Sequence, residues 1–129
     1  MNIIWFRNDL RTLDNPTLFY AQKNRLPTLA VFYVCLDQWQ SQDVSKRKID
    51  IIYQRLLGLT EELNALNIPL YIFNTPTYKN STEHLNNLIK DNQATNVFFN
   101  NEYELDEIKR DNSFIQQASK FNTHQYDGN

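Results

Sequence analysis

One group of residues with chemical potential follows directly on an apolar run near the start of the chain. Arg7, Asp9 and Arg11 come after the run 2–6, so two cations and one acid stand at its end. Two arginines at this spacing can hold an anion or a partner, and the intervening acid can instead bridge the arginines and fix the loop. The segment therefore predicts either a binding loop or an internally paired one.

A second group of polar residues follows a later apolar run. Asp106 and Glu107 stand just after the run 97–99 and open a predicted helix. Carboxylates accept hydrogen bonds from the donor groups of a ligand. Acids in the first turn of a helix also stabilise it by interacting with the helix dipole, with no ligand involved. Both interpretations are open on the residues alone.

Three polar loops are predicted to meet at one edge of the molecule. They span residues 7–15, 35–45 and 100–106, and the middle one contains Trp39 and Gln42. Each follows an apolar segment that reads as a strand. Ligands of open parallel sheets bind beyond the carboxyl ends of the strands, where the strand order reverses. The sequence therefore predicts a binding site formed by these loops.

The elements that position these loops alternate along the chain. Apolar runs predict strands, and apolar residues spaced three and four apart predict helices. Alternating strands and helices indicate an α/β fold, a Rossmann-like three-layer sandwich with a five-stranded parallel sheet in a single domain, residues 1–129. The predicted strands are 2–6, 28–34, 70–73, 97–99 and an edge strand at 123–126, and the predicted helices are 16–23, 46–66, 80–90 and 105–121. We expect five core residues to be buried: Trp5, Val31, Ile52, Leu56 and Phe98.

The composition argues against several classes of function. The chain has only 2 glycines, neither in a strand-to-helix turn, so a glycine-rich phosphate loop is excluded. A net charge of −2 gives no electrostatic footprint for DNA over the whole domain. No apolar stretch approaches the ~18 residues of a membrane span, and no signal peptide is present, so we expect no membrane association and a cytoplasmic location.

The remaining reactive residue types form no recognisable catalytic or metal-binding pattern. Cys35 is the single cysteine, so no internal disulfide can form, and a free thiol suits a reducing compartment. His84 and His124 lie far apart and lack the spacing of metal ligands, so we expect no metal site. No Ser-His-acid or Cys-His arrangement can be assembled at the polar edge, and we expect no catalytic residue in this chain.

Three motifs resemble the DNA photolyase/cryptochrome family. The first is Trp5-Phe6-Arg7-Asn8-Asp9-Leu10-Arg11 with Asp14-Asn15 just beyond, which resembles the opening of that family. The second is the segment 98–107 followed by Arg110-Asp111, and the third, a looser match, is Gln38-Trp39 followed by Ser45 and Arg47. The resemblance covers the whole chain and is closest to folate-type photolyases of cyclobutane pyrimidine dimers.

The resemblance implies a chromophore site made of four residues. In folate-type photolyases an Asn-Glu pair contacts the pterin ring of 5,10-methenyltetrahydrofolate, and Asp106 and Glu107 occupy those positions here. Gln42 stands where many members have a histidine that packs on the chromophore, and Arg7 completes the expected cleft. Asp106 departs from the family's Asn, because an ionised Asp only accepts hydrogen bonds whereas Asn also donates them.

The family resemblance also implies a role within a larger protein. The chain resembles the amino-terminal domain, which holds an antenna chromophore and passes light energy to FAD in a helical carboxyl-terminal domain absent from this chain. The flavin then repairs cyclobutane pyrimidine dimers, so damaged DNA is a partner only through the missing domain. The implied parent is a light-driven repair enzyme, whereas this piece is not catalytic alone. We expect weak or no antenna binding by the isolated domain, and self-association through its exposed domain interface.

Three other functions stay open at this point. The parent could be a cryptochrome-type light sensor, which the missing domain would decide. The domain could bind an adenine nucleotide, as related stress-protein domains do, although the absence of a glycine turn counts against it. It could also be a structural platform with an empty cleft.

Overall fold

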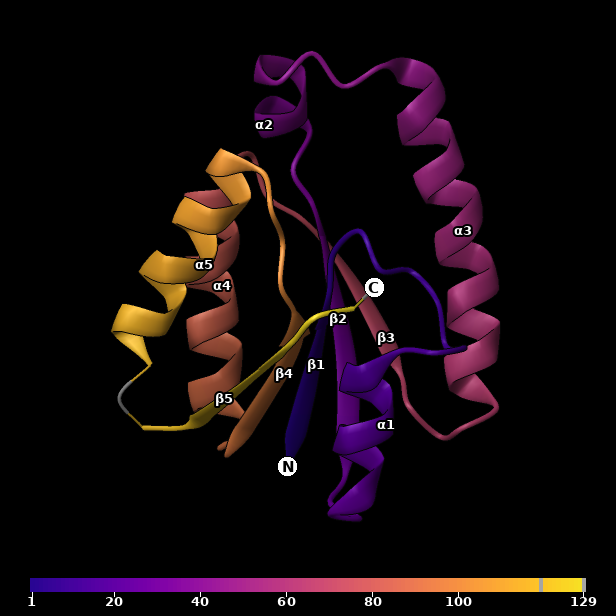
Figure 1. Cartoon of the computed structure of the whole chain (residues 1–129), viewed down its shortest axis with the longest axis vertical. Coiled ribbons are helices and arrows are strands. Elements are labelled where there is room, and N and C mark those ends of the chain that lie inside the picture. Colours follow the sequence, from indigo (N-terminus) through magenta and orange to yellow (C-terminus); the bar gives the residue numbers. More distant parts are fainter. Residues whose placement is uncertain (119, 129) are drawn as a thin grey trace.

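A five-stranded parallel sheet forms the centre of the molecule (Figure 1). The structure, a computed structural model, describes residues 1–118 and 120–128. The strands pair in the order β3-β2-β1-β4-β5, and every neighbouring pair is parallel. Their bounds are β1 (Asn2–Phe6), β2 (Thr28–Val34), β3 (Leu70–Asn74), β4 (Asn96–Asn100) and β5 (Asn122–Tyr126). The predicted α/β fold with a five-stranded parallel sheet is confirmed.

Helices cover both faces of the sheet and complete three layers. The bounds are α1 (Pro16–Lys23), α2 (Leu36–Ser41), α3 (Lys46–Asn64), α4 (Tyr78–Asp91) and α5 (Leu105–Gln117). Helices α1 and α3 lie on one face of the sheet, and α4 and α5 lie on the other (Figure 1). Their apolar side chains pack against the strands on each face. The short helix α2 lies beyond the carboxyl end of β2, at the edge where the polar loops gather.

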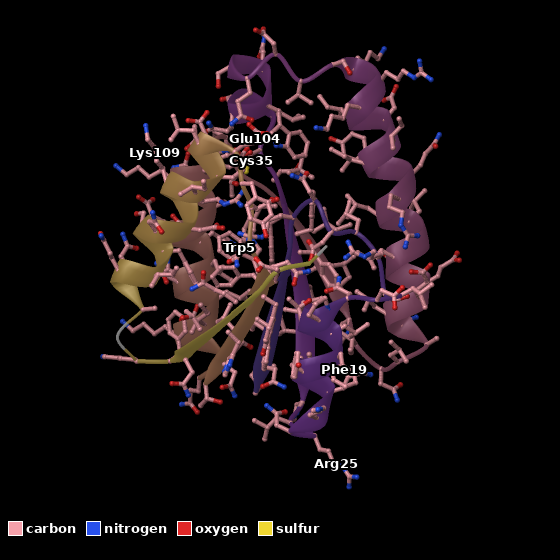
Figure 2. All side chains as sticks on the ribbon, viewed as in Figure 1. Trp5, Phe19, Arg25, Cys35, Glu104 and Lys109 are labelled. Atoms are coloured by element: carbon pink, nitrogen blue, oxygen red, sulfur yellow. The ribbon has the colours of Figure 1, made fainter. Side chains whose placement is uncertain are left out.

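In β1, β2 and β4, alternate residues contribute to two separate cores, one on each face of the sheet (side chains in Figure 2). Ile4 and Phe6 of β1 point to the α1 and α3 side, whereas Ile3 and Trp5 point to the α4 and α5 side. Every residue of β1 is buried, as expected for a central strand of a parallel sheet. This burial holds the carboxyl end of β1, and therefore Arg7, in a fixed place.

Four of the five residues expected in the core are buried: Trp5, Val31, Leu56 and Phe98. The prediction for Ile52 is wrong, because that side chain is only half-buried. Ile52 lies in the first half of α3, which extends past the sheet edge, and it lines an open cleft there. It still packs against the core on that face, so Ile52 contacts the core and also lines the cleft.

Helices α2, α4 and α5 also differ from the sequence prediction. The segment 35–45, predicted as a loop, contains α2, whose six residues are too few to show a helical period. Helix α4 was predicted to begin after Asn80, but it begins at Tyr78, and Thr77 caps it by accepting a hydrogen bond from the Asn80 amide. This earlier start places Tyr78 in the first turn. Helix α5 ends at Gln117, short of the predicted residue 121, and residue 119 of that prediction lies outside the described part of the chain.

Two leucines of α3 test whether the buried apolar side chains of this helix stabilise its packing on the sheet. Leu59 is fully buried, whereas Leu57 is 72% exposed on the same helix. We expect Leu59→Ala to lower the free energy of unfolding by about 2–5 kcal/mol, because it removes buried methyl groups and leaves a cavity. Leu57→Ala is the matched control and should change it by less than about 0.5 kcal/mol. Chemical denaturation measures both, and equal losses would contradict the packing described here.

Candidate functional site

A cleft opens at the carboxyl edge of the sheet, at the point where the strand order reverses. From β1 the chain continues to β2 on one side, whereas β4 is followed by β5 on the other, so the loops after β1 and β4 diverge. The cleft has a volume of about 430 Å³. Its apolar lining includes Phe32 of β2, Trp39 of α2, Val44 between α2 and α3, and Ile52 of α3. Its polar lining includes Arg7, Gln42, Tyr78, Glu102, Asp106, Glu107 and Arg110.

Arg7 lies on the floor of the cleft in a buried ion pair. Its Nη1 and Nη2 donate to the two carboxylate oxygens of Asp111 at 2.6 and 3.0 Å, and Nη2 also donates to the carbonyl of Asn100. The guanidinium carbon lies 4.5 Å from the ring centre of Trp5 and 4.8 Å from that of Phe99. Burial and the neighbouring Arg110 lower the pKa of Arg7, while Asp111 opposes that shift. Most of the N–H donors of Arg7 are therefore bonded to acceptors within the protein.

Arg110 shares the same counter-charge. Its Nε donates to Asp111 at 3.0 Å, and its guanidinium carbon lies 4.7 Å from the ring centre of Tyr78. Its Nη2 is fully buried and makes no hydrogen bond with any described residue; a Glu102 oxygen is 3.6 Å away. Burial raises the pKa of Glu102, whereas Arg7 and Arg110 lower it. Asp111 is thus the acceptor that joins the two arginines.

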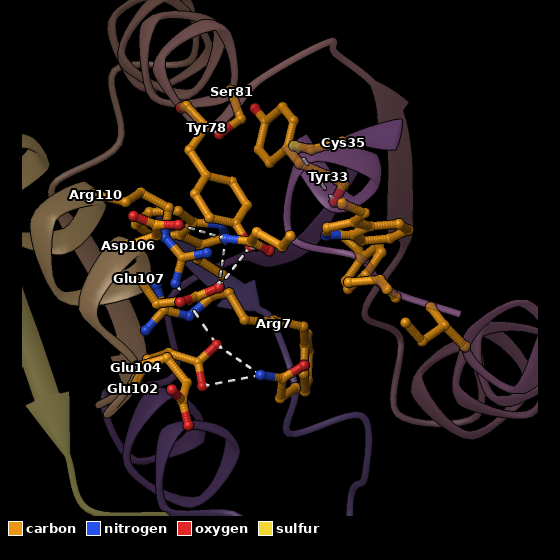
Figure 3. A pocket seen from close by; sticks show the side chains of 18 of the residues that line it. Arg7, Tyr33, Cys35, Tyr78, Ser81, Glu102, Glu104, Asp106, Glu107 and Arg110 are labelled. Carbon is orange, nitrogen blue, oxygen red and sulfur yellow. Dashed lines mark hydrogen bonds and ion pairs between the residues drawn. The ribbon is translucent and has the colours of Figure 1, made fainter. Parts of the chain in front are cut away.

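Glu107 stands at the centre of a hydrogen-bonded group above this floor (Figure 3). It accepts from the Tyr78 hydroxyl at 2.7 Å and from Gln42 Nε2 at 3.3 Å, both at Oε1. Gln42 Nε2 also donates to Asp106 Oδ2 at 3.1 Å. Burial, followed by the hydrogen bond to Glu107, raises the pKa of Tyr78, so its hydroxyl stays protonated and donates. Glu107 Oε2 accepts no hydrogen bond within the described ranges and is available to a ligand.

The four residues predicted for the site all line this cleft. Gln42, Asp106 and Glu107 are in direct contact, whereas Arg7 lies below them and contacts Asp111 instead. Whether these residues bind a chromophore stays a prediction.

Asp9 does not form the bridge between Arg7 and Arg11 that was one of the two interpretations of the sequence. It accepts from the Arg7 backbone amide at 2.9 Å and from Asn100 Nδ2 at 2.7 Å. Asp9 therefore fixes the loop after β1, but through the backbone and Asn100, and it makes no ion pair with Arg7 or Arg11. Trp39 is buried against Phe32, with ring centres 6.3 Å apart, and also lines the cleft.

Sequence reasoning did not find the roles of Tyr78, Arg110 and Asp111. Glu107, Arg110 and Asp111 are spaced three and four apart, which places them on one face of α5. All three are buried on the same face as Phe114, so their spacing relative to that apolar residue is the available signal. Nothing in the sequence indicates Tyr78, because its place depends on where α4 begins and on how α4 packs beside α5.

Other reactive groups lie outside this arrangement. Cys35 is buried, and burial raises the pKa of its thiol. Among residues 1–118 and 120–128, no three His, Cys, Asp or Glu side chains converge as metal ligands would. Across the same residues, no helix has the length and apolar character needed to cross a membrane.

Comparison with known proteins gives one consistent family. The profile described as DNA photolyase matches residues 2–129. A deoxyribodipyrimidine photo-lyase of Buchnera aphidicola from Acyrthosiphon pisum is 41% identical over 85% of this chain and 23% of its own length. The enzyme of the same name from Vibrio cholerae is 36% identical over 93% of this chain and 26% of its own length. The chain thus spans about a quarter of the length of these relatives.

A solved structure supports the same fold. The crystal structure of a class III photolyase from Agrobacterium tumefaciens aligns with a TM-score of 0.73 and 20% sequence identity. The alignment covers 98% of this chain and 25% of that one. At this identity the likeness concerns the fold alone.

The buried ion pair should matter far more to stability than an exposed one. Asp111→Asn leaves the charges of Arg7 and Arg110 buried without their anion, so we expect the free energy of unfolding to fall by about 3–5 kcal/mol. The control is Glu62→Gln, which breaks the 3.0 Å pair with Arg55, where the side chains are 38% and 41% exposed. That loss should stay below about 1 kcal/mol. Similar small losses in urea denaturation would show that Asp111 is not the anchor of the site.

Proposed function

The chain belongs to the DNA photolyase family, and on that basis we propose that it is the amino-terminal, antenna-binding domain of a deoxyribodipyrimidine photolyase. The observation that carries the proposal is the Glu107 carboxylate, held by Tyr78 and Gln42 over a cleft at the reversal of strand order. A cleft of about 430 Å³ falls within the usual range for small-molecule sites.

We propose a folate of the methenyltetrahydrofolate type as the antenna, because its pterin edge suits the residues present. That edge carries an amino group and a ring N–H side by side, and a carboxylate accepts both in a bidentate pair. Glu107 has Oε2 unoccupied, and a ligand donor can replace the Gln42 N–H at Oε1, where the Tyr78 hydroxyl stays bonded. Trp39 and Phe32 supply apolar surface for the ring system. When bound, the folate supplies absorption of near-ultraviolet and blue light.

The protein residues then have separate tasks in this proposal. Glu107 binds and orients the pterin edge, and Tyr78 fixes the Glu107 carboxylate by donating to it. Arg7, Arg110 and Asp111 form the buried floor that holds α5, and so Glu107, against β1 and β4. No residue in the cleft is assigned a part in DNA repair, which belongs to FAD and damaged DNA in the rest of a longer protein.

We also propose that a flavin-binding domain of the same protein covers the carboxyl edge. Residues in segments that follow β2 and β4 expose large apolar side chains there: Leu36, Tyr103 and Leu105 are 47%, 59% and 66% exposed. Large apolar side chains left exposed at one edge of the molecule indicate a contact surface. Without such a domain, self-association of the 129-residue chain would bury the same side chains.

A longer protein that contains this chain should show two sets of absorption bands, one from flavin and one near-ultraviolet band from the antenna. It should also repair cyclobutane pyrimidine dimers in light. The 129-residue chain alone should bind no flavin and repair no DNA, because it lacks the domain that binds them. Absorption spectroscopy and a photorepair assay measure both. Photorepair by the chain alone, or a longer protein with neither band, would refute the proposal.

Substitution of Glu107 tests the antenna site itself. In the longer protein, Glu107→Gln should reduce the antenna band, because the amide places a donor NH₂ opposite one of the two donors of the pterin edge. Flavin content and repair by the pre-reduced enzyme should be unchanged. Glu104→Gln, on the exposed rim of the same cleft, is the matched control. An unchanged antenna band in Glu107→Gln would show that Glu107 is not a ligand.

A further inference from the structure

Gln42 joins the two acids of the cleft through one nitrogen atom. It follows the last residue of α2, and its Nε2 lies 3.1 Å from Asp106 Oδ2 and 3.3 Å from Glu107 Oε1. A carboxamide nitrogen carries two N–H groups. In this state one N–H points to each acid, so the side chain occupies an acceptor that a ligand would use.

A ligand that pairs with Glu107 changes this arrangement in a defined way. Its donors replace the Gln42 N–H at Glu107, while the second N–H remains bonded to Asp106. Asp106, when ionised, only accepts, so it can hold the Gln42 nitrogen beside Glu107 but cannot itself donate to a ligand. The released N–H of Gln42 then faces the ligand next to the carboxylate.

This inference rests on the antenna site proposed above. We propose that Gln42 is a specificity-determining residue. Together with Glu107 it presents two acceptors and then one donor to a ligand, and this order selects ligands that carry an amino group, a ring N–H and a carbonyl group in succession. This is the 2-amino-4-oxopyrimidine edge shared by pterins and guanine. Asp106 is a positioning residue that orients the Gln42 amide. In this chain the donor therefore comes from residue 42, because residue 106 is an acid.

The same pattern rejects other heterocycles of similar size. The pyrimidine edge of a flavin or a deazaflavin offers a carbonyl, an N–H and a second carbonyl, so a carbonyl oxygen would face a Glu107 oxygen. A site built around hydrogen bonds discriminates strongly against a ligand that leaves them unpaired. Two other donors of the described lining, Arg7 Nε and Arg110 Nη2, make no hydrogen bond, but both are fully buried. Gln42 is half-buried at the cleft, where a ligand can reach it.

The test compares probes that differ at this edge. Chemical-shift titration of the ¹⁵N-labelled 129-residue chain suits weak binding, and it reports on the Gln42 side-chain amide directly. We expect pterin to bind about tenfold more tightly than its 4-thioxo analogue, which keeps the amino group and the ring N–H but has sulfur, a weak acceptor, in place of the carbonyl oxygen. Pterin should also shift the Gln42 amide signals. Guanosine carries the same edge, so comparable binding of guanosine would support the edge and assign the site to a nucleobase instead of a folate.

Variants at residue 42 separate specificity from structure. Gln42→Ala removes the donor, and Gln42→Glu replaces it with an acceptor, so in both the preference for pterin should fall below about threefold. Gln40→Ala, at an exposed position of α2, is the matched control and should keep the full preference. A preference that is absent in the unmodified chain, or that survives in both Gln42 variants, overturns this inference alone. Failure of all three probes to bind the chain also overturns this inference, whereas the antenna band of the longer protein decides the folate assignment separately.

Discussion

The buried charge of Arg7 is the constraint on which the rest of the site depends. A guanidinium removed from water needs a counter-charge and hydrogen-bond acceptors close by. Arg7 follows β1 directly, and it finds its acceptors at the end of β4 and in α5, through the Asn100 carbonyl and Asp111. One side chain therefore ties together the two strands at which the sheet reverses its order and the helix that follows them.

The position of α5 then decides what the cleft can bind. Glu107 lies one turn before Asp111, so the helix that is fixed by the ion pair also presents the carboxylate to the cleft. Tyr78 reaches that carboxylate from α4, and Gln42 reaches it from the turn after α2. Three segments that are distant in sequence thus converge on one carboxylate, which gives the site a defined hydrogen-bonding pattern instead of a general acidic surface.

The sequence predicted the sheet, the helical layers and the edge at which the site lies, because apolar periodicity and strand alternation are local signals. Family motifs also indicated Gln42, Asp106 and Glu107, which line the cleft; that they bind a chromophore stays a prediction. The sequence did not predict α2, which is too short to show a period, or the start of α4, where Thr77 and Asn80 are both acceptable caps. The partners of Arg7 and the contact of Tyr78 with Glu107 depend on packing between distant segments, for which no local signal exists.

The central claim is that Glu107 forms the ligand-binding centre of this domain. The most direct measurement is a crystal structure of the chain soaked with methenyltetrahydrofolate. The account predicts the pterin edge within hydrogen-bond distance of both Glu107 oxygens, with Gln42 still bonded to Asp106 but no longer to Glu107. Density for the folate elsewhere on the molecule, with the Gln42–Glu107 hydrogen bond intact, would contradict it.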